Sequence, residues 1–237
     1  MTKYEQIADI IRKRIKEGIY PTDSWLPNQV DLVDEFQVSR VTIKKAMNIL
    51  TMEGLVYSQR GAGTRVLNND LLGVDNYSAK DYEGLSVQMK GRDLKSHIIY
   101  FNVEFPDELV QKRLMISAHQ PVYKIIRLRI VDGNPYVIEH SFMPTNIVLN
   151  LTVDVLKKSI YDYIHQELGL GFAGALRNIK ADRPDDYDKE FLKCGDCDPI
   201  LELDQVIYLK DGKIIDYSRS RSRFDQRSYS VLDVIDN

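Results

Sequence analysis

The sequence is poor in the residues that cross-link small secreted domains or bind metals. Its 237 residues include only two cysteines and one tryptophan, and no apolar run approaches the roughly 20 residues needed to cross a bilayer. Two cysteines provide no disulfide framework. Cys194 and Cys197 have the spacing of half a zinc site, but zinc takes about four ligands. The histidines are scattered: His97, His119, His140 and His165. We therefore expect no metal, no cofactor and no membrane span.

Charge is nearly balanced over the whole chain and does not by itself indicate a partner. The 32 Lys and Arg stand against 35 Asp and Glu, a formal net charge of −3, and 43% of the residues are hydrophobic. This composition is typical of a soluble globular protein with one or two domains. Met1 leads straight into an amphipathic helical pattern rather than an apolar signal segment, which predicts a cytoplasmic protein.

The segment from 26 to 66 has the pattern of two helices followed by a hairpin. Ser39 is a favoured cap for a helix that begins at Arg40, because its hydroxyl can accept from the free N–H groups of the next turn. A shorter helix is expected over 28–36 with Asn28 as its cap, and a first helix over 4–17. The second helix of such a pair presents its first turns to base edges and phosphates. Apolar residues at near-helical spacing predict its core stripe: Val41, Ala46, Ile49 and Leu50.

A glycine-rich hairpin follows this helix. Gly54 is placed to end the helix in a left-handed conformation, and strands are expected over 55–58 and 64–67. From 38 to 66 five basic residues stand against one acidic residue, a local charge of +4 on an acidic protein. This patch predicts a DNA-binding surface, the alternative being a small helical domain for protein contacts. Its candidate residues are Ser39, Arg40, Thr42, Lys44, Lys45, Arg60, Gly61, Gly63 and Thr64.

Four fragments in this order resemble the signature of the GntR family of bacterial transcription regulators. They are Leu26-Pro27, Val38-Ser39-Arg40, Glu53-Gly54-Leu55 and Gly61-Ala62-Gly63-Thr64. The resemblance implies a winged helix-turn-helix that binds operator DNA. Family members often carry arginine where this chain has Val30 and a basic residue where it has Ala62. These departures predict a weaker phosphate contact or a different operator, and we assign no base contact to either position.

Residues 68–80 are polar and lack periodicity, so we interpret them as a linker between a domain over 1–67 and a second domain over 81–237. The second domain alternates strand and helix patterns, which predicts an α+β fold on an antiparallel sheet with flanking helices. Strands are expected over 95–105, 122–131, 136–143, 172–181, 200–209 and 214–224. Helices are expected over 107–114, within 151–168 and over 185–194.

This order of elements resembles the UTRA domain, the effector-binding half of the HutC subfamily within GntR, whose fold is similar to that of chorismate lyase. The matching fragments are Arg127-Leu128-Arg129, Asp132-Gly133-Asn134-Pro135, Glu139-His140-Ser141, Ser159-Ile160-Tyr161, and Asp211-Gly212 followed by Asp216-Tyr217-Ser218. With the winged domain, the resemblance covers nearly the whole chain.

Two arginines of one strand are the first candidates for an effector site. Arg127 and Arg129 are two residues apart, so both side chains leave the same face of a strand. Two adjacent guanidiniums repel each other and are best tolerated around an anion, although surface arginines or ion pairs would explain them equally. The resemblance implies an effector site, often for a sugar phosphate, at Arg127, Arg129, Glu139 and Ser159, with Ser96, Tyr161 and Asp216 as further candidates. Many UTRA domains have tyrosine where this chain has Ser222, which predicts a more open pocket.

Residues 218–223 alternate serine and arginine, and we expect the arginines on a solvated outer face. The leading hypothesis is a transcription regulator, expected to be a repressor. A homodimer would bind a palindromic double-stranded DNA operator, and a small anionic effector such as a phosphorylated sugar would change its affinity. The alternatives are an enzyme acting on a small carboxylated substrate and an architectural DNA-binding protein without an effector. The sequence contains no Ser-His-Asp set, metal cluster or phosphate-binding loop, so we expect no catalytic residues.

Overall fold

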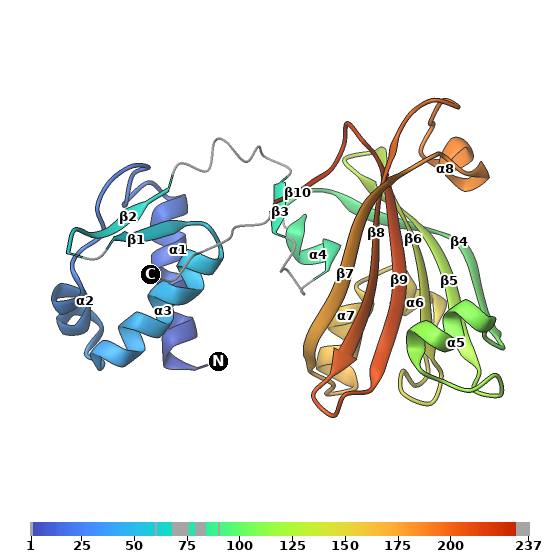
Figure 1. Cartoon of the computed structure of the whole chain (residues 1–237), viewed down its shortest axis with the longest axis horizontal. Coiled ribbons are helices and arrows are strands. Elements are labelled where there is room, and N and C mark those ends of the chain that lie inside the picture. The colour runs from blue at the N-terminus through green and yellow to red at the C-terminus, as the bar shows by residue number, and fades with distance from the viewer. Residues whose placement is uncertain (1, 60, 68–75, 79–83, 90, 231–237) are drawn as a thin grey trace. The chain divides into compact units, whose positions relative to one another are not determined.

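A computed structural model describes residues 2–59, 61–67, 76–78, 84–89 and 91–230 (Figure 1). The chain divides into two compact units, one of Met1–Ser78 with Tyr229–Asn237 and one of Ala79–Ser228. Arg60 and most of the predicted linker over 68–80 lie outside the described residues. Within the described ranges, no helix combines the length and the apolar character that a membrane crossing requires.

In the described residues up to 67, the first unit contains three helices and a two-stranded sheet: α1 (Lys3–Lys16), α2 (Gln29–Phe36), α3 (Arg40–Met52), β1 (Val56–Gln59) and β2 (Gly63–Val66). α2 begins after Asn28, whose Oδ1 accepts hydrogen bonds from the N–H groups of Val30 at 2.8 Å and Asp31 at 3.0 Å. α3 begins after Ser39, whose Oγ accepts from the N–H of Thr42 at 3.3 Å. Both caps predicted from the sequence are confirmed.

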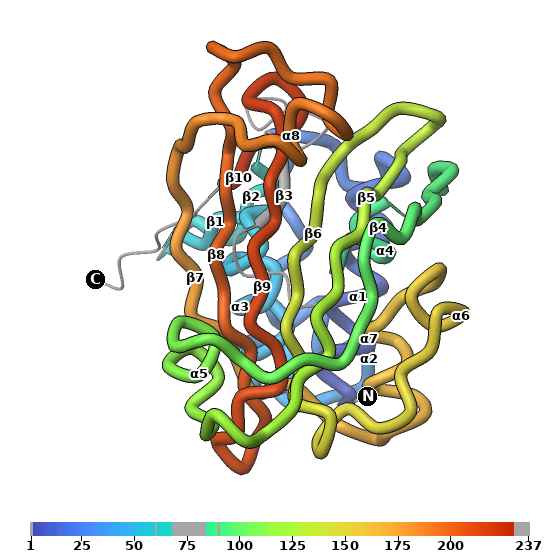
Figure 2. Tube along the Cα trace, turned by 90° about the vertical axis from the view of Figure 1, so that its right-hand side faces the viewer, coloured from blue at the N-terminus to red at the C-terminus, as the bar shows by residue number. Residues whose placement is uncertain are grey.

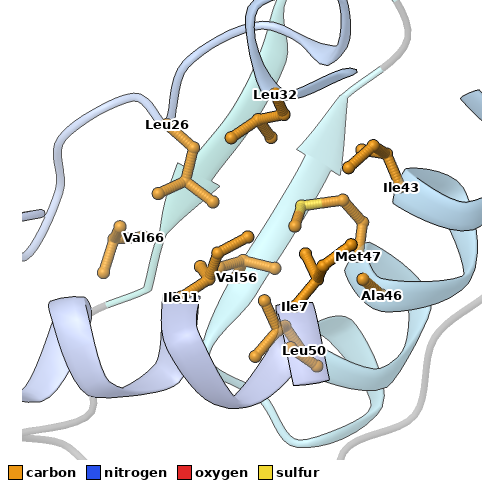
Figure 3. Packing of buried hydrophobic residues seen from close by; sticks show 11 residues of the cluster. Ile7, Ile11, Leu26, Leu32, Ile43, Ala46, Met47, Leu50, Val56 and Val66 are labelled. Carbon is orange, nitrogen blue, oxygen red and sulfur yellow. The ribbon is translucent and has the colours of Figure 1, made fainter. Parts of the chain in front are cut away.

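The core of this unit lies between α1, α3 and the small sheet (Figure 3). The residues of α3 that it buries are Ile43, Ala46, Met47 and Leu50. The predicted stripe is therefore right for Ala46 and Leu50 and wrong for Val41, which is 64% exposed. Residues two apart on a helix point roughly 200° apart around its axis, so burying Ile43 turns Val41 away from the core.

The hairpin of β1 and β2 is a wing whose tip is built from glycine. Gly61 and Gly63 have φ of +82° and +117°, a left-handed region that favours glycine. Trp25 forms an antiparallel bridge with Arg65 of β2, and a Cβ on Gly63 would lie 3.4 Å from the Trp25 ring. Trp25 thus packs against the wing, although its side chain stays half exposed.

The second unit is built on a six-stranded antiparallel sheet. Its strands are β4 (Leu94–Glu104), β5 (Val122–Val131), β6 (Asn134–Pro144), β7 (Phe172–Asp182), β8 (Ile200–Leu209) and β9 (Ile214–Arg223). They lie in the order β4-β5-β6-β9-β8-β7, which can be followed across Figure 2. β5 turns into β6 through Asp132 and Gly133, both with positive φ, as a two-residue hairpin requires. The predicted sheet is confirmed.

Helices cover both faces of the sheet. On one face α5 (Glu108–Leu114) packs on Tyr217, and the segment that contains α8 (Asp186–Phe191) packs on Ile126 and Ile138. On the other face lie α6 (Val153–Leu156), α7 (Ile160–Asp162) and the π-helical turn η2 (Tyr163–Glu167). The helix expected within 151–168 is thus divided into short pieces, because Ser159 is extended and caps a new helix.

Three further short elements complete the described chain. They are α4 (Leu85–Gln88), β3 (Asn76–Ser78) and β10 (Ser228–Ser230), of which β3 and β10 form a two-stranded sheet.

The arginine face of 218–223 is not a solvated outer face, and that prediction is wrong for Arg221, which is 2% exposed. Its guanidinium donates to Asp188 at 2.7 Å, to Asp182 at 2.8 Å and to Glu202. These acceptors come from α8, β7 and β8, so the network joins α8 to the sheet. Asp188 and Glu202 are also buried, and a buried charge is tolerated only when it is paired.

Candidate functional sites

α3 exposes a face opposite to its buried stripe. Its exposed residues are Arg40, Val41, Lys44, Lys45 and Asn48, with Met52 exposed at the C-terminal end of the helix. The Nζ of Lys45 lies 5.5 Å from the ring centroid of Tyr4, a cation–π contact that ties this side chain to α1. Glu53, the one acidic residue of the segment 38–66, accepts from Arg12 at 2.6 and 2.8 Å. The exposed face is therefore basic, and the nearest acid of the segment is already paired.

The described members of the predicted DNA-binding set all lie at the surface of the first unit. Ser39, Gly61 and Gly63 are exposed and Thr42 and Thr64 are half-buried. The hydroxyls of Ser39 and Thr42 are 3.0 Å apart, and Thr64 pairs with Ser58 across the wing at 2.9 Å.

Two positions where the chain departs from the family pattern, Val30 and Ala62, are also exposed. The surface thus has apolar side chains at both of them. Arg60, predicted at the wing tip, lies outside the described residues.

In the second unit the structure brings Arg127 and Arg129 to one carboxylate. Arg127 and Glu139 are direct cross-strand partners, and Arg127 Nη2 donates to Glu139 Oε2 at 2.7 Å. Arg129 Nη1 reaches the same oxygen at 3.4 Å. Arg127 also donates to the carbonyl of Leu156 at 2.8 Å, so its guanidinium holds the end of α6.

The two arginines differ in how well they are satisfied. Arg127 makes two short hydrogen bonds and one of 3.4 Å to the Lys158 carbonyl, whereas the side-chain contacts of Arg129, to Glu139 and to Ser86 of α4, are both 3.4 Å long. Within the described part of the chain, Arg129 Nε and the hydroxyl of Ser96 are buried without a hydrogen-bond partner. Ser96 is the β4 partner of Arg129. Such unsatisfied donors mark a place where a ligand or ordered water belongs.

Burial and charge act in opposite directions on this cluster. Burial lowers the pKa of Arg127, and the charge of Arg129 lowers it further, while Glu139 opposes both. Burial alone would raise the pKa of Glu139, but the charges of Arg127 and Arg129 outweigh it and leave this pKa below its usual value. The carboxylate is thus ionised, and the cluster of two guanidiniums and one carboxylate has a net positive charge.

Arg129 opens onto a pocket of about 320 Å³. Ser159, the N-cap of α7, lines this pocket, and its Oγ accepts from the N–H of Asp162 at 3.1 Å. The pocket is lined by Ser86, Met89, Gly91, Arg92, Leu94, Arg129, Lys157, Lys158, Ser159 and Asp162. Its ionisable lining is therefore mainly cationic, and it has hydroxyls from α4 and from the start of α7.

A second polar group adjoins this cluster on the same face of the sheet. Tyr161 donates from its hydroxyl to Asp216 Oδ2 at 3.1 Å, and Ser218 donates to the same atom at 3.0 Å. Gln205 Nε2 donates to the hydroxyls of Ser218 at 3.2 Å and Tyr161 at 3.3 Å. Burial raises the pKa of Asp216 to about 7, against the lowering effect of the Ser218 and Tyr161 hydrogen bonds.

The structure thus places all seven predicted effector-site residues on or beside one face of the sheet. Sequence reasoning missed Ser86, which comes from α4, and Gln205, whose contact depends on the pairing of β8 with β9. The polar alternation of 218–223 was a signal for Ser218.

Ser222 is buried, with the carbonyl oxygen of Leu201 as its acceptor at 3.5 Å, and it does not line the described pocket. The Cys194 thiol is buried, and burial raises its pKa to about 11, so it is a structural residue of the turn after α8.

Comparison with known proteins gives a family for each unit. Residues 3–66 match the model of bacterial regulatory proteins of the gntR family, and residues 89–227 match the UTRA domain. The HTH-type transcriptional regulator GmuR of Bacillus subtilis is 42% identical over 228 residues, covering 95% of this chain and 96% of its own. The HTH-type transcriptional regulator TreR of the same organism is 29% identical over 226 residues, covering 95% and 94%.

Solved structures agree with this assignment. The possible transcriptional regulator YydK of Bacillus subtilis superposes with a TM-score of 0.84 at 25% identity, over 99% of this chain and all of its own. The effector-binding domain of the B. subtilis trehalose repressor TreR matches with a TM-score of 0.56 at 29% identity, over 60% of this chain and 99% of its own. The chain belongs to the GntR family, in its UTRA-containing HutC subfamily, and is a ligand-responsive DNA-binding transcription regulator.

Proposed function

We propose that the protein is a repressor of a sugar or other carbon-source operon and that a phosphorylated sugar is its effector. The observation that carries this proposal is the buried sharing of one Glu139 oxygen by Arg127 and Arg129. This arrangement has an uncompensated positive charge, and a buried charge is stable only when it is paired. A phosphate that entered beside Arg129 would supply the missing negative charge.

The donors around the pocket suit a phosphate. Arg129 has an unsatisfied Nε and long contacts, so its guanidinium can turn two N–H groups toward an anion. Lys157 and Lys158 add charge at the pocket wall, and Ser159 and Ser96 add hydroxyl donors. Arg127 is already bonded to the Leu156 carbonyl and to Glu139, so we propose that it positions the carboxylate rather than grips the ligand.

The neighbouring hydroxyl, amide and carboxyl groups suit a polyhydroxylated ligand. Tyr161, Asp216, Gln205 and Ser218 are linked by hydrogen bonds that can be exchanged for sugar hydroxyls. Asp216 Oδ1 is buried without a partner among the described residues. Relatives are consistent with sugars: one is named as the trehalose repressor and another, from Escherichia coli, as the repressor of a mannosyl-D-glycerate transport and metabolism system.

We further propose that a cytoplasmic homodimer binds a palindromic operator through two copies of α3, about 34 Å apart. The effector would favour a dimer geometry that fits the operator poorly, and its effect is limited to its differential affinity for the two states. We retain 1–67, 68–80 and 81–237 as the proposed domain and linker limits. In limited proteolysis followed by mass spectrometry, the first cleavage is expected within 68–80. A first cleavage elsewhere would move these limits.

A thermal-shift and calorimetric screen tests the effector assignment. Phosphorylated sugars are compared with their unphosphorylated parents, because a ligand of the folded state raises the midpoint by mass action. We expect one phosphosugar to stabilise the wild type and to release operator DNA, and Arg129→Ala to weaken its binding at least about tenfold, the effect of losing a charged hydrogen bond. Arg223→Ala is the matched control, since Arg223 pairs with Asp225 outside the pocket.

Two outcomes would reject this assignment. One is equal stabilisation by a phosphosugar and its parent. The other is equal loss of binding in Arg129→Ala and in the control. Turnover of a bound compound would instead favour an enzyme acting on a small carboxylated substrate.

A further inference from the structure

The exposed position of Val41 on α3 has no explanation in the folding of the first unit. Val41 is 64% exposed, whereas the apolar residues at 43, 46, 47 and 50 face the core, as Figure 3 shows for their side chains. Valine is a poorer helix former than alanine, so it does not stabilise α3 either. An exposed apolar residue is common on protein surfaces, and its surroundings decide whether it has a role.

The surroundings of Val41 are cationic. Arg40, Lys44 and Lys45 share the exposed face of α3 with it, one helical turn or less away. Lys45 is held against Tyr4, and Glu53 is neutralised by Arg12, so the face keeps its positive charge. Two apolar side chains are exposed on α3: Val41, in the first turn after the Ser39 cap, and Met52, the last residue of the helix. Of the two, only Val41 stands among the cations at the start of the helix.

The first turn of a recognition helix is the part that meets base edges in the major groove. Only one base presents an apolar group there, the C5-methyl of thymine, which apolar side chains contact. We propose that Val41 is a specificity residue of this regulator and packs on a thymine methyl in each operator half-site. The neighbouring cations hold the DNA backbone, and Val41 supplies a sequence-dependent contact that does not depend on charge.

The methyl group can be removed from either side of this contact. An operator is first selected with the wild-type protein from a pool of random duplexes, and each thymine is then replaced singly by uracil, which lacks only the methyl. Affinities are measured by fluorescence anisotropy for the wild type and for Val41→Ala. We expect uracil at one position of each half-site to weaken wild-type binding about fourfold, which corresponds to about 0.8 kcal/mol for one buried methyl-sized group.

In Val41→Ala the same uracil substitution is expected to change the affinity less than about twofold, because the partner methyls are gone. The variant is expected to bind the thymine operator several-fold more weakly and to retain the wild-type salt dependence. Lys44→Ala is the contrasting variant: it is expected to lower the slope of log K against log salt by about 0.9 and to keep the uracil sensitivity. Ile19→Ala removes an equally exposed apolar side chain outside α3 and is expected to leave both unchanged.

The melting temperature of Val41→Ala should equal or exceed that of the wild type, because alanine is the better helix former and no core contact is lost. The proposal is overturned if Val41→Ala binds the selected operator as tightly as the wild type. It is also overturned if the variant loses affinity but keeps every uracil effect at its wild-type size. Neither result affects the assignment of the effector, because the thermal-shift and calorimetric tests of effector binding contain no DNA.

Discussion

Replacing Asp216 by asparagine should make the second unit more stable at neutral and alkaline pH. Asp216 is fully buried, and its pKa is raised from 3.8 to about 7, primarily by burial. Asparagine has nearly the same shape, and its carbonyl oxygen can accept from Tyr161 and Ser218 as Oδ2 does. The substitution therefore keeps the hydrogen bonds and removes the ionisation.

The sign follows from proton binding. Between about pH 4 and pH 7 the folded state holds the Asp216 proton while the unfolded chain has lost it, so the free energy of unfolding falls as pH rises through this window. At about 1.36 kcal/mol per pH unit over roughly three units, the wild type loses up to about 4 kcal/mol. Asp216→Asn loses none of it. The variant should match the wild type near pH 4 and exceed it by up to about 4 kcal/mol near pH 8.

Urea unfolding followed by circular dichroism at a series of pH values measures this difference. Asp211→Asn is the matched control: Asp211 is exposed, and its hydrogen bond from Lys213 lowers its pKa, so the wild type gains a little stability as pH rises through the acidic range and this variant does not. The reasoning fails if Asp216→Asn is no more stable than the wild type near pH 8. It fails equally if the two proteins differ by a constant amount at every pH.

Three further changes have defined outcomes. Arg221→Met should lower the free energy of unfolding by about 3–5 kcal/mol because Asp188 is left buried and unpaired; a loss below about 1 kcal/mol in urea unfolding would contradict this. Gly63→Ala should lower the free energy of unfolding by about 1–3 kcal/mol, because Gly63 has φ +117°, and should weaken operator binding measured by anisotropy. Unchanged affinity would show that the wing does not contact the operator. Cys197 should react with a thiol reagent in the folded protein and Cys194 only after unfolding, since its thiol is buried with a pKa near 11; equal rates would refute that assignment.

Local patterns were sufficient for the elements of this fold but not for the environment of every residue. β5 occupies the predicted range 122–131, because a β-branched run ends at a two-residue turn in which Asp132 and Gly133 have positive φ. The helix caps Asn28 and Ser39 were equally local signals. Alternation placed Arg127 and Arg129 on one face, and the hairpin register then brought Glu139 between them.

The two wrong predictions, for 218–223 and for Val41, have one physical cause. The repeat of a sequence pattern shows which residues share a face of a strand or helix, but not which face the rest of the protein covers. In 218–223 the alternation allowed either face to be solvated, and the acceptors that bury Arg221 come from three distant elements. In α3 both Val41 and Ile43 could begin an apolar stripe, and packing against α1 selected Ile43. Long-range contacts decide such cases, and no window of sequence contains them.

The packing of Trp25 on the wing has a spectroscopic consequence. Since it is the only tryptophan of the chain, indole emission reports solely on the unit that holds α3 and the wing. Tyrosine absorption and far-ultraviolet dichroism, in contrast, sample the six-stranded sheet as well. A single denaturation experiment recorded in both channels therefore separates the two units without any label. Coincident transitions would indicate that they unfold together, and separated transitions would give each unit its own midpoint.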